Sequence, residues 1–325
     1  MMPDASILYL SRSDVESIAV SMTDIIDALE RMFSDKGRGR AEMPPKPGIH
    51  PSADAFIHAM PGFLPDLGVA GLKWVSGFPQ NRRRGLPYVS GLIILNDPAT
   101  GLPTSVMDAT WITAMRTGAA TAVAAKHLAR QDSSTVGIIA CGVQGRSNLE
   151  ALTCVFQVSS VLAYDVDTAA AHDFAEEAHQ RWGVEVSVAS TPERVVRQAD
   201  IVVTSGPIHK DPHPTIEAGW LAPGAFACTL DFDSYWHGTA LAEVEKLATD
   251  DRAQLEYYRA AGYFRTTPVP YADLGEIVTG ARSGRESEDQ RIICINLGLA
   301  LEDITTADLV YHKAQSLGVG VTLPL

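Results

Sequence analysis

The stretch Val136-Gly-Ile-Ile-Ala-Cys-Gly-Val-Gln-Gly145 decides the fold of this chain. Its apolar residues predict a buried strand, its glycines a tight turn, and the following residues 146–152 a helix. In that context Gly142 lets the backbone approach a pyrophosphate, whose negative charge faces the N-terminus of the helix. The first glycine of the usual G-x-G-x-x-G pattern is Ala140 here. An alanine is tolerated there only if the position does not need a positive φ angle.

An acidic residue completes this dinucleotide fingerprint. Asp165 follows the next apolar strand, 20 residues after Gly145, where a carboxylate would accept hydrogen bonds from an adenosine ribose. A 2′-phosphate would meet a like charge there, so we predict NAD(H) rather than NADP(H). The competing interpretation is an ordinary strand-to-helix turn in which Asp165 caps a helix. The register of strand, turn, helix and acid favours the dinucleotide site.

A later strand ends in polar residues that would lie along the same crevice, as the carboxyl ends of strands do in open parallel sheets. The residues expected to contact the cofactor are therefore Gly142, Val143, Gln144, Gly145, Asp165, Thr204 and Ser205.

Apolar runs alternate with amphipathic helical patterns after residue 135, which predicts an α/β domain with a doubly wound, Rossmann-type sheet. The runs are residues 136–140, 161–164, 184–188, 201–204 and 225–230. Earlier residues predict a second, α+β domain. Its expected elements are a long helix over 13–37 begun by a capping box at Ser13 and Glu16, strands over 56–60, 69–75 and 89–95, and an alanine-rich helix ending near Leu128.

The helical pattern at residues 304–317 matches the first part of the chain better than the α/β part. We therefore expect residues 133–299 to form the NAD-binding Rossmann domain. Residues 1–132 together with 300–325 are expected to form the other domain.

The balance of charges narrows the classes of partner. The chain has 39 acidic and 26 basic side chains, a net charge of −13, so its field repels nucleic acid and anionic lipid unless a basic patch is concentrated somewhere. Only the run Arg82-Arg83-Arg84 comes close, and without interleaved aromatic residues it is typical of a solvated turn. We expect neither a nucleic-acid partner nor a membrane partner.

Cysteine usage and the N-terminal residues predict a cytoplasmic location. The four cysteines form no C-x-x-C pair and are too few for a disulfide scaffold of this length. The N-terminal residues lack a charged segment followed by an apolar one, and no apolar run is long enough to span a bilayer.

No metal site is expected. His209 and His213 have the spacing of a zinc-binding helix, but the prolines at positions 212 and 214 prevent that helix. Asp231-Phe-Asp233 offers two carboxylates without a clustered third ligand, an arrangement more often hydrogen-bonded than metal-bound.

Two basic residues lie in apolar surroundings. Lys73 stands in the strand-like run Val69-Ala-Gly-Leu-Lys-Trp-Val75, and a buried lysine needs a partner or a lowered pKa. Arg116 lies in the alanine-rich helix, on a surface that is not expected to face bulk water. A structural ion pair would explain either residue alone. Together, in a chain with a dinucleotide site, they predict a carboxylate clamp in which Lys73 is also available for proton transfer.

Four blocks of sequence are more specific than any single residue. They are Gly71-Leu-Lys-Trp-Val-Ser-Gly-Phe-Pro-Gln-Asn81, Leu95-Asn-Asp-Pro-Ala-Thr-Gly-Leu-Pro103, Asp108-Ala-Thr-Trp-Ile-Thr-Ala-Met-Arg-Thr-Gly-Ala-Ala120 and Gly142-Val-Gln-Gly145. From about Asp14 to the final helix, the chain resembles the ornithine cyclodeaminase/μ-crystallin family. The resemblance implies a substrate and dimerisation domain completed by the C-terminal helix, a Rossmann domain, a homodimer, and NAD-dependent chemistry on amino or imino acids.

The resemblance also implies roles for single residues. The substrate-carboxylate lysine of the family corresponds to Lys73, and the arginine that follows it corresponds to Arg116. The catalytic aspartate of the family corresponds to Asp231, which follows a strand and is well placed for general acid/base work. Taken from the residues alone, Asp231 could equally be a helix or turn cap.

This chain departs from the family pattern at two places where substrate identity is set. An earlier carboxylate-binding arginine of the family is replaced by Lys46, a point charge that cannot make the bidentate fork of an arginine. The stretch after Asp231 usually reads Pro-Gly-Lys with a following glutamate, whereas this chain has Asp233-Ser-Tyr-Trp-His-Gly238.

Three functions compete. The leading hypothesis is NAD(H)-dependent reduction of a small imino acid, or oxidation of the matching amino acid. In it Lys46, Lys73 and Arg116 hold the carboxylate and Asp231 relays the proton, while hydride transfer needs only alignment and exclusion of water. The alternative enzyme is a redox-neutral ornithine or lysine cyclodeaminase, which needs an acidic group for the distal amine. The third is a non-catalytic dinucleotide- or ligand-binding protein, which would have no need of a proton-transfer group.

Overall fold

The computed structural model describes residues 6–52 and 55–325. Contacts divide the chain into two compact units: unit 1 runs to Arg116 and resumes at Leu299, and unit 2 comprises Thr117–Gly298. The first division falls inside helix α3 (Thr110–Leu128), earlier than the expected domain boundary at residue 133, because this one helix contributes residues to both units.

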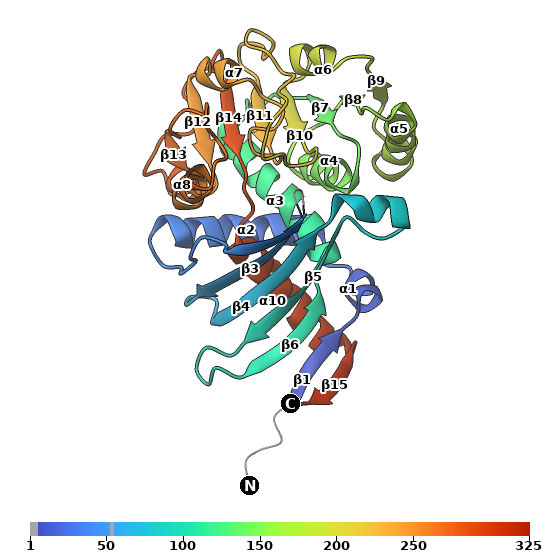
Figure 1. Ribbon diagram of the computed structural model, residues 1–325, viewed down its shortest axis with the longest axis vertical. Helices are drawn as coiled ribbons and strands as arrows, with labels where there is room; N and C mark the ends of the chain where they lie inside the picture. Colours follow the sequence, from blue (N-terminus) through green and yellow to red (C-terminus); the bar gives the residue numbers. More distant parts are fainter. Residues whose placement is uncertain (1–5, 53–54) are drawn as a thin grey trace. The chain divides into compact units, whose positions relative to one another are not determined.

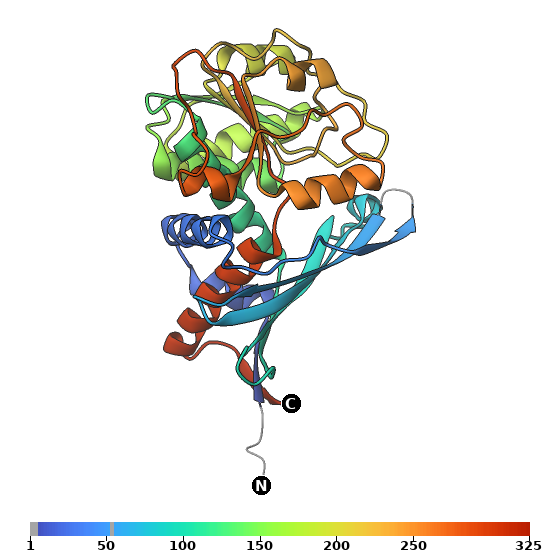
Figure 2. The same cartoon turned by 90° about the vertical axis from the view of Figure 1, so that its left-hand side faces the viewer.

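Unit 1 is built on a seven-stranded sheet in the order β15-β1-β6-β5-β4-β3-β2 (Figure 1). Neighbouring strands are antiparallel except β1 and β6. The strands are β1 (Ser6–Leu10), β2 (Gly48–Ser52), β3 (Ala55–Leu64), β4 (Val69–Gly77), β5 (Val89–Asn96), β6 (Pro103–Asp108) and β15 (Val321–Pro324). Helix α10 (Ala300–Leu317) packs on one face of β3, β4 and β5, with α2 (Met22–Gly37) against it (Figure 2). A 3-10 helix, Pro79–Arg84, leads from β4 to β5.

The single long helix predicted at the N-terminus is wrong, because the structure has two helices there. Helix α1 (Arg12–Ile18) ends where Ala19 adopts a left-handed conformation with φ = 52°, and Ser21 caps the new helix α2. The capping box of α1 is formed by Ser11 and Asp14 rather than by the predicted pair two residues further along.

Strand β3 continues through Pro61, where the sequence predicted a break. The backbone N–H groups of Ala59 and Phe63 point away from β4, since they donate to the carbonyls of Pro47 and Glu42. Pro61 has the same orientation by the two-residue period of a strand, so its missing N–H removes no hydrogen bond between β3 and β4.

Unit 2 is an eight-stranded parallel sheet in the order β13-β12-β14-β11-β10-β7-β8-β9. Its strands are β7 (Thr135–Ile139), β8 (Ser160–Tyr164), β9 (Val186–Val188), β10 (Ile201–Thr204), β11 (Phe226–Thr229), β12 (Lys246–Thr249), β13 (Ala272–Asp273) and β14 (Ile292–Ile295). Its helices after α3 are α4 (Val143–Val155), α5 (Thr168–Trp182), α6 (Pro192–Gln198), α7 (Gly238–Ala242), α8 (Arg252–Ala260) and α9 (Leu274–Val278).

The order of these strands places a topological switch point between β7 and β10. From β7 the chain moves outward through β8 and β9, and it then returns to the other side of β7 for β10 and β11. Ligands of open α/β sheets bind at the carboxyl ends of the strands beside such a point. The predicted Rossmann-type doubly wound sheet is confirmed, although the sequence did not predict β12, β13 and β14. Over the described residues, no helix combines the length and the apolar character needed to cross a membrane.

Candidate functional site

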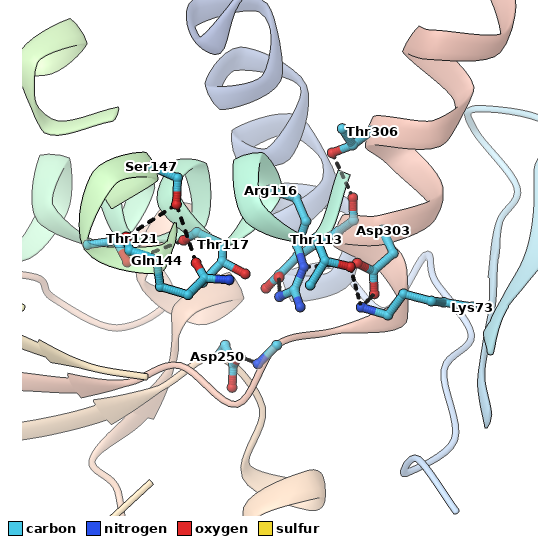
Figure 3. A network of polar contacts seen from close by, with 12 residues as sticks. Lys73, Thr113, Arg116, Thr117, Thr121, Gln144, Ser147, Asp250, Asp303 and Thr306 are labelled. Atoms are coloured by element: carbon cyan, nitrogen blue, oxygen red, sulfur yellow. Dashed lines mark hydrogen bonds and ion pairs between the residues drawn. The ribbon is translucent and has the colours of Figure 1, made fainter. Parts of the chain in front are cut away.

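Unit 1 contains a network of buried charges. Figure 3 shows Lys73 of β4 and Arg116 of α3 directed toward Asp303 of α10. Lys73 Nζ lies 2.7 Å from Asp303 Oδ2, and Arg116 Nε lies 2.9 Å from Asp303 Oδ1. Arg116 Nη1 also lies 2.6 Å from Oε2 of the neighbouring Glu302. Because Arg116 contacts both acids, the four groups form one network rather than two separate pairs.

Burial controls the protonation of this network. Removal from water lowers the pKa of Lys73 to about 7, although the charge of Asp303 acts in the opposite direction. Burial also raises the pKa of Glu302, against the opposing effect of Arg116. Lys73 donates a hydrogen bond of 3.4 Å to Thr113 Oγ1. A lysine that titrates near physiological pH can both bind an anion and exchange a proton.

A third cation, Lys46, is also buried, with 8% of its surface exposed, and precedes β2 in the chain. Its charge lowers the pKa of Lys73 and of His58 on β3. Burial first, and then Lys46, lowers the pKa of His58 to about 3, so this imidazole is neutral at physiological pH. Three buried cations, Lys46, Lys73 and Arg116, thus lie close enough to influence one another electrostatically.

The tertiary structure brings the predicted Lys46, Lys73 and Arg116 into one electrostatic cluster, and their role in binding a substrate stays a prediction. The sequence analysis missed Glu302 and Asp303 because it began the last helix at residue 304, whereas α10 begins at Ala300. The sequence did contain a signal for them, because two adjacent acids interrupt an apolar run. Acids are seldom buried without a partner, so this pattern indicates a buried ion pair.

In unit 2, the predicted dinucleotide turn connects β7 to α4. Gly142 is the N-cap of α4, and a Cβ atom there would meet no other atom within 4 Å. Gly145 is constrained instead, because its Cβ would lie 2.7 Å from the carbonyl oxygen of Ala140. Val143 and Gln144 complete the first turn of the helix, and Val143 is largely exposed. The turn is thus tight on its inner side and open beside Gly142.

Ala140 adopts φ = 73°. From the sequence, an alanine is expected to be tolerated here only if the position does not need a positive φ angle, and the structure shows that it does. The conformation is held from two sides. The N–H group of Ala140 donates to the carbonyl of Tyr164 at 2.9 Å, and the hydroxyl of Ser205 donates to the carbonyl of Ala140 at 3.0 Å. The rest of the turn therefore imposes a strained backbone on this alanine.

We expect Ala140→Gly to raise the free energy of unfolding by about 0.5–1 kcal/mol, because glycine adopts a positive φ without steric cost. Urea-induced unfolding would measure the change. The matched control is Ala175→Gly in the interior of α5, which should instead lower the free energy of unfolding by about 1 kcal/mol. Equal destabilisation by both substitutions would contradict the strain at Ala140.

Asp165 directly follows β8 and lies beside the turn. Its Oδ2 accepts a hydrogen bond of 2.8 Å from the N–H group of Cys141, and its Oδ1 accepts one of 2.9 Å from that of Asp167. The alternative that Asp165 caps the next helix is wrong, since Asp167 is the N-cap of α5. A carboxylate has further lone pairs, so binding of a ribose by Asp165 stays a prediction.

Asp231 is fully buried after β11, and its carboxylate is held by the last residue of β10 and by the loop that follows it. The hydroxyl of Thr204 donates to Oδ1 at 2.9 Å, and the N–H group of Gly206 donates to Oδ2 at 3.0 Å. Trp236 Nε1 in turn donates to the Thr204 hydroxyl at 3.2 Å. Burial raises the pKa of Asp231 to about 7 in spite of these hydrogen bonds. A carboxyl group that titrates near neutrality at the carboxyl edge of a sheet is suited to general acid/base chemistry.

The hydroxyls of Thr204 and Ser205, which the sequence assigned to the cofactor, have partners inside the protein, namely Asp231 and Ala140. They orient the proposed proton-transfer group and the turn, and direct contact with a cofactor stays a prediction. No cluster of three or more histidine, cysteine, aspartate or glutamate residues that could hold a metal ion occurs in the part of the chain that the structure describes.

Comparisons with known proteins agree with this arrangement. The model of the ornithine cyclodeaminase/mu-crystallin family matches residues 7–318. The alanine dehydrogenase of Archaeoglobus fulgidus is 38% identical over 324 residues, which cover 96% of this chain and 97% of that protein.

Two solved structures are similar over nearly their whole length. The Δ1-pyrroline-2-carboxylate reductase of Thermococcus litoralis, in complex with NADH and L-proline, is 34% identical with a TM-score of 0.88, over 97% of this chain and 99% of that one. An archaeal alanine dehydrogenase dimer with bound NAD is 36% identical with a TM-score of 0.88, over 99% of this chain and 100% of that one. With the charged cluster, the dinucleotide turn and Asp231 all present, this chain belongs to the ornithine cyclodeaminase/mu-crystallin family.

Proposed function

We propose that this protein is an NAD(H)-dependent oxidoreductase that reduces a small imino acid, or oxidises the corresponding amino acid, at the carbon that bears nitrogen. The observation that carries the proposal is Asp231, a buried carboxyl group with a pKa of about 7 on the sheet edge that also carries the dinucleotide turn. The relatives of this protein support hydride transfer at a carbon that bears nitrogen, since one is an alanine dehydrogenase and another is a Δ1-pyrroline-2-carboxylate reductase.

The residues of unit 2 fit a dinucleotide. The open side of Gly142 and the N-terminus of α4 suit a pyrophosphate, and Asp165 suits a ribose that lacks a 2′-phosphate. When bound, the nicotinamide supplies or accepts the hydride. We assign Gly142, Val143, Gln144, Gly145, Asp165, Thr204 and Ser205 to this site.

The substrate is held and protonated by the chain itself. Lys46, Lys73 and Arg116, three buried cations, bind its carboxylate. In reduction, Asp231 donates a proton to the imine nitrogen and thereby makes the adjacent carbon a better hydride acceptor. In oxidation the order is reversed: hydride leaves the carbon of the neutral amine, and the ionised Asp231 then takes the proton from the nitrogen.

Reduced-nicotinamide absorbance tests this function directly. Purified protein with NADH should consume it in the presence of Δ1-pyrroline-2-carboxylate or of pyruvate with ammonia, and NADPH should serve about tenfold less well because of the charge of Asp165. Ammonia release from ornithine or lysine with catalytic NAD⁺, and no net absorbance change, would instead establish a cyclodeaminase. NADH binding without either reaction would make the protein a ligand-binding member of the family.

We also propose that the protein is a homodimer joined through the outer face of the sheet in unit 1. That face is apolar and open to solvent: Trp74 and Leu92, which are register partners on β4 and β5, are 45% and 43% exposed. Tyr9 on β1 and Leu323 on β15 extend this exposed apolar face toward the β15 end of the sheet, and they are 39% and 41% exposed. An uncovered apolar face of this kind marks an interface, and the related archaeal alanine dehydrogenase is a dimer.

We expect the double variant Trp74→Asp, Leu92→Asp to be monomeric in multi-angle light scattering, with half the mass of the wild type. Two carboxylates on each copy would face their counterparts in the apolar interface and could not be desolvated. The control Val269→Asp changes an exposed valine of unit 2 and should leave the mass unchanged. A monomeric wild type would contradict the dimer.

The proposed location is the cytoplasm. None of the four cysteines, all within the described residues, forms a disulfide, as expected for a protein kept in a reducing compartment.

A further inference from the structure

We propose that Arg146 is a positioning residue for the cofactor: it holds two carbonyl groups of the dinucleotide turn, so that the adjoining N–H groups are directed at the pyrophosphate. The inference rests on the proposed function and names how this chain builds its phosphate site. It concerns a side chain that is not expected to touch the reacting atoms.

The contacts of Arg146 are with the inner side of the turn. Its Nη1 donates to the carbonyl of Cys141 and, at 3.3 Å, to the carbonyl of Gly142. Its own backbone N–H group also donates to Gly142, at 3.2 Å. One side chain therefore restrains two consecutive peptide groups.

Peptide geometry transmits this restraint to the opposite side of the turn. In a trans peptide the carbonyl and the N–H group point in opposite directions. A fixed carbonyl of Cys141 therefore directs the N–H group of Gly142 the other way, and a fixed carbonyl of Gly142 does the same for Val143. Among the described residues, none accepts a hydrogen bond from either of these N–H groups.

The preceding N–H groups of the turn, by contrast, are satisfied within the protein. That of Ala140 donates to the carbonyl of Tyr164, and that of Cys141 donates to the carboxylate of Asp165. The unsatisfied donors thus begin at Gly142, where the absence of a side chain leaves open space. Two aimed donors at a helix N-terminus are the groups that a pyrophosphate requires.

Arg146 is itself held in place from helix α5. Its Nε lies 2.5 Å from Glu177 Oε2, and its guanidinium lies 5.8 Å from the centre of the Phe174 ring. Burial alone would raise the pKa of Glu177, but hydrogen bonds from Arg146 and Arg181 hold it below its usual value. The guanidinium is thereby committed to the turn and to Glu177, which makes it a support for the phosphate site rather than a phosphate ligand.

Arg181 offers a matched control. It lies 2.9 Å from the other oxygen of Glu177 and 3.1 Å from Glu150, so it belongs to the same ion network. Its described contacts do not include the turn. Arg181→Ala therefore removes the same charge from the same glutamate while leaving the carbonyls of the turn held.

The test measures binding of NADH by fluorescence, and of ADP-ribose and adenosine by competition, to the full-length wild type, Arg146→Ala, Arg146→Lys and Arg181→Ala. We expect Arg146→Ala to raise the dissociation constants of NADH and ADP-ribose by about tenfold or more, because both ligands carry the pyrophosphate. The dissociation constant of adenosine should change by less than about twofold. Arg181→Ala should change the dissociation constants of all three ligands by less than about twofold. Arg146→Lys should recover part of the loss, since an ammonium group can donate to carbonyls.

Enzyme kinetics add a second readout. With Arg146→Ala, the KM for NADH should rise while kcat at saturating NADH and the KM for the imino acid stay unchanged. Equal effects of Arg146→Ala and Arg181→Ala, or an equal loss for adenosine, would overturn the positioning role alone. If Arg146→Ala does not fold, Arg146→Lys carries the same test. A wild type that does not bind NADH would overturn the proposed function and this inference with it.

Discussion

Asp231→Asn is expected to lower kcat for imine reduction by a factor of about 10² or more while leaving the affinity for NADH within about twofold of the wild type. The amide has nearly the size of the carboxyl group. It can still accept the hydrogen bond from Gly206, and its NH₂ can donate to the hydroxyl of Thr204. What it cannot do is deliver or accept the proton of the reaction. Steady-state rates and fluorescence titration of NADH measure the two quantities separately.

The role of Asp231 in proton transfer also predicts how the rates of reduction and oxidation depend on pH. Burial raises the pKa of Asp231 to about 7, so the carboxyl group is a proton donor below about pH 7 and a base above it. With substrate saturating, kcat for reduction by the wild type should therefore fall as pH rises through about 7, and kcat for oxidation should rise. Both trends should be absent from the residual activity of Asp231→Asn.

The control for Asp231 is Asp233→Asn. Asp233 is also buried, and burial raises its pKa too, but its described hydrogen bond from Thr267 is a long one of 3.5 Å. We expect this variant to keep kcat within about threefold of the wild type, since it lacks the contacts with Thr204 and Gly206 that orient Asp231. A larger loss in Asp233→Asn than in Asp231→Asn would transfer the proton-transfer role to Asp233.

Lys73→Met is expected to have the largest effect on stability, lowering the free energy of unfolding by about 3 kcal/mol. The substitution removes the nearer partner of Asp303, a carboxylate with no exposed surface. The estimate lies at the low end for a broken buried ion pair because Arg116 Nε remains 2.9 Å from the same carboxylate. Urea-induced unfolding would measure this change, and saturation with the imino acid should be lost in the same variant.

The double variant Lys73→Met, Asp303→Asn separates stability from substrate binding. Neutralising the stranded carboxylate should recover most of the lost stability, because the charge left without a partner is gone. It should not recover substrate saturation, since the lysine that binds the carboxylate is still absent. Recovery of activity together with stability would show that Lys73 is only a structural partner of Asp303.

The sequence by itself determined the doubly wound character of unit 2 and its dinucleotide turn, though not the last three strands of its sheet. A buried strand, a glycine turn, a helix and Asp165 follow one another within 30 residues (136–165), so their arrangement depends on local geometry that a linear pattern records. It also singled out Lys73 and Arg116, because a charge in an apolar run must be compensated wherever the chain folds. Asp231 was assigned only through the resemblance to the family, since from the residues alone it could equally have been a cap.

The partners of these residues depended on tertiary structure alone. Asp303 meets Lys73 from a helix more than 200 residues later in the chain, and Thr204 meets Asp231 because β10 and β11 are neighbours in the sheet. The strain at Ala140 likewise follows from Tyr164 at the end of β8 and Ser205 just after β10, which hold its backbone from two sides. Burial moves the pKa values of Lys73 and Asp231 to about 7 against the opposing effect of their partners, and it arises only when distant segments exclude water together.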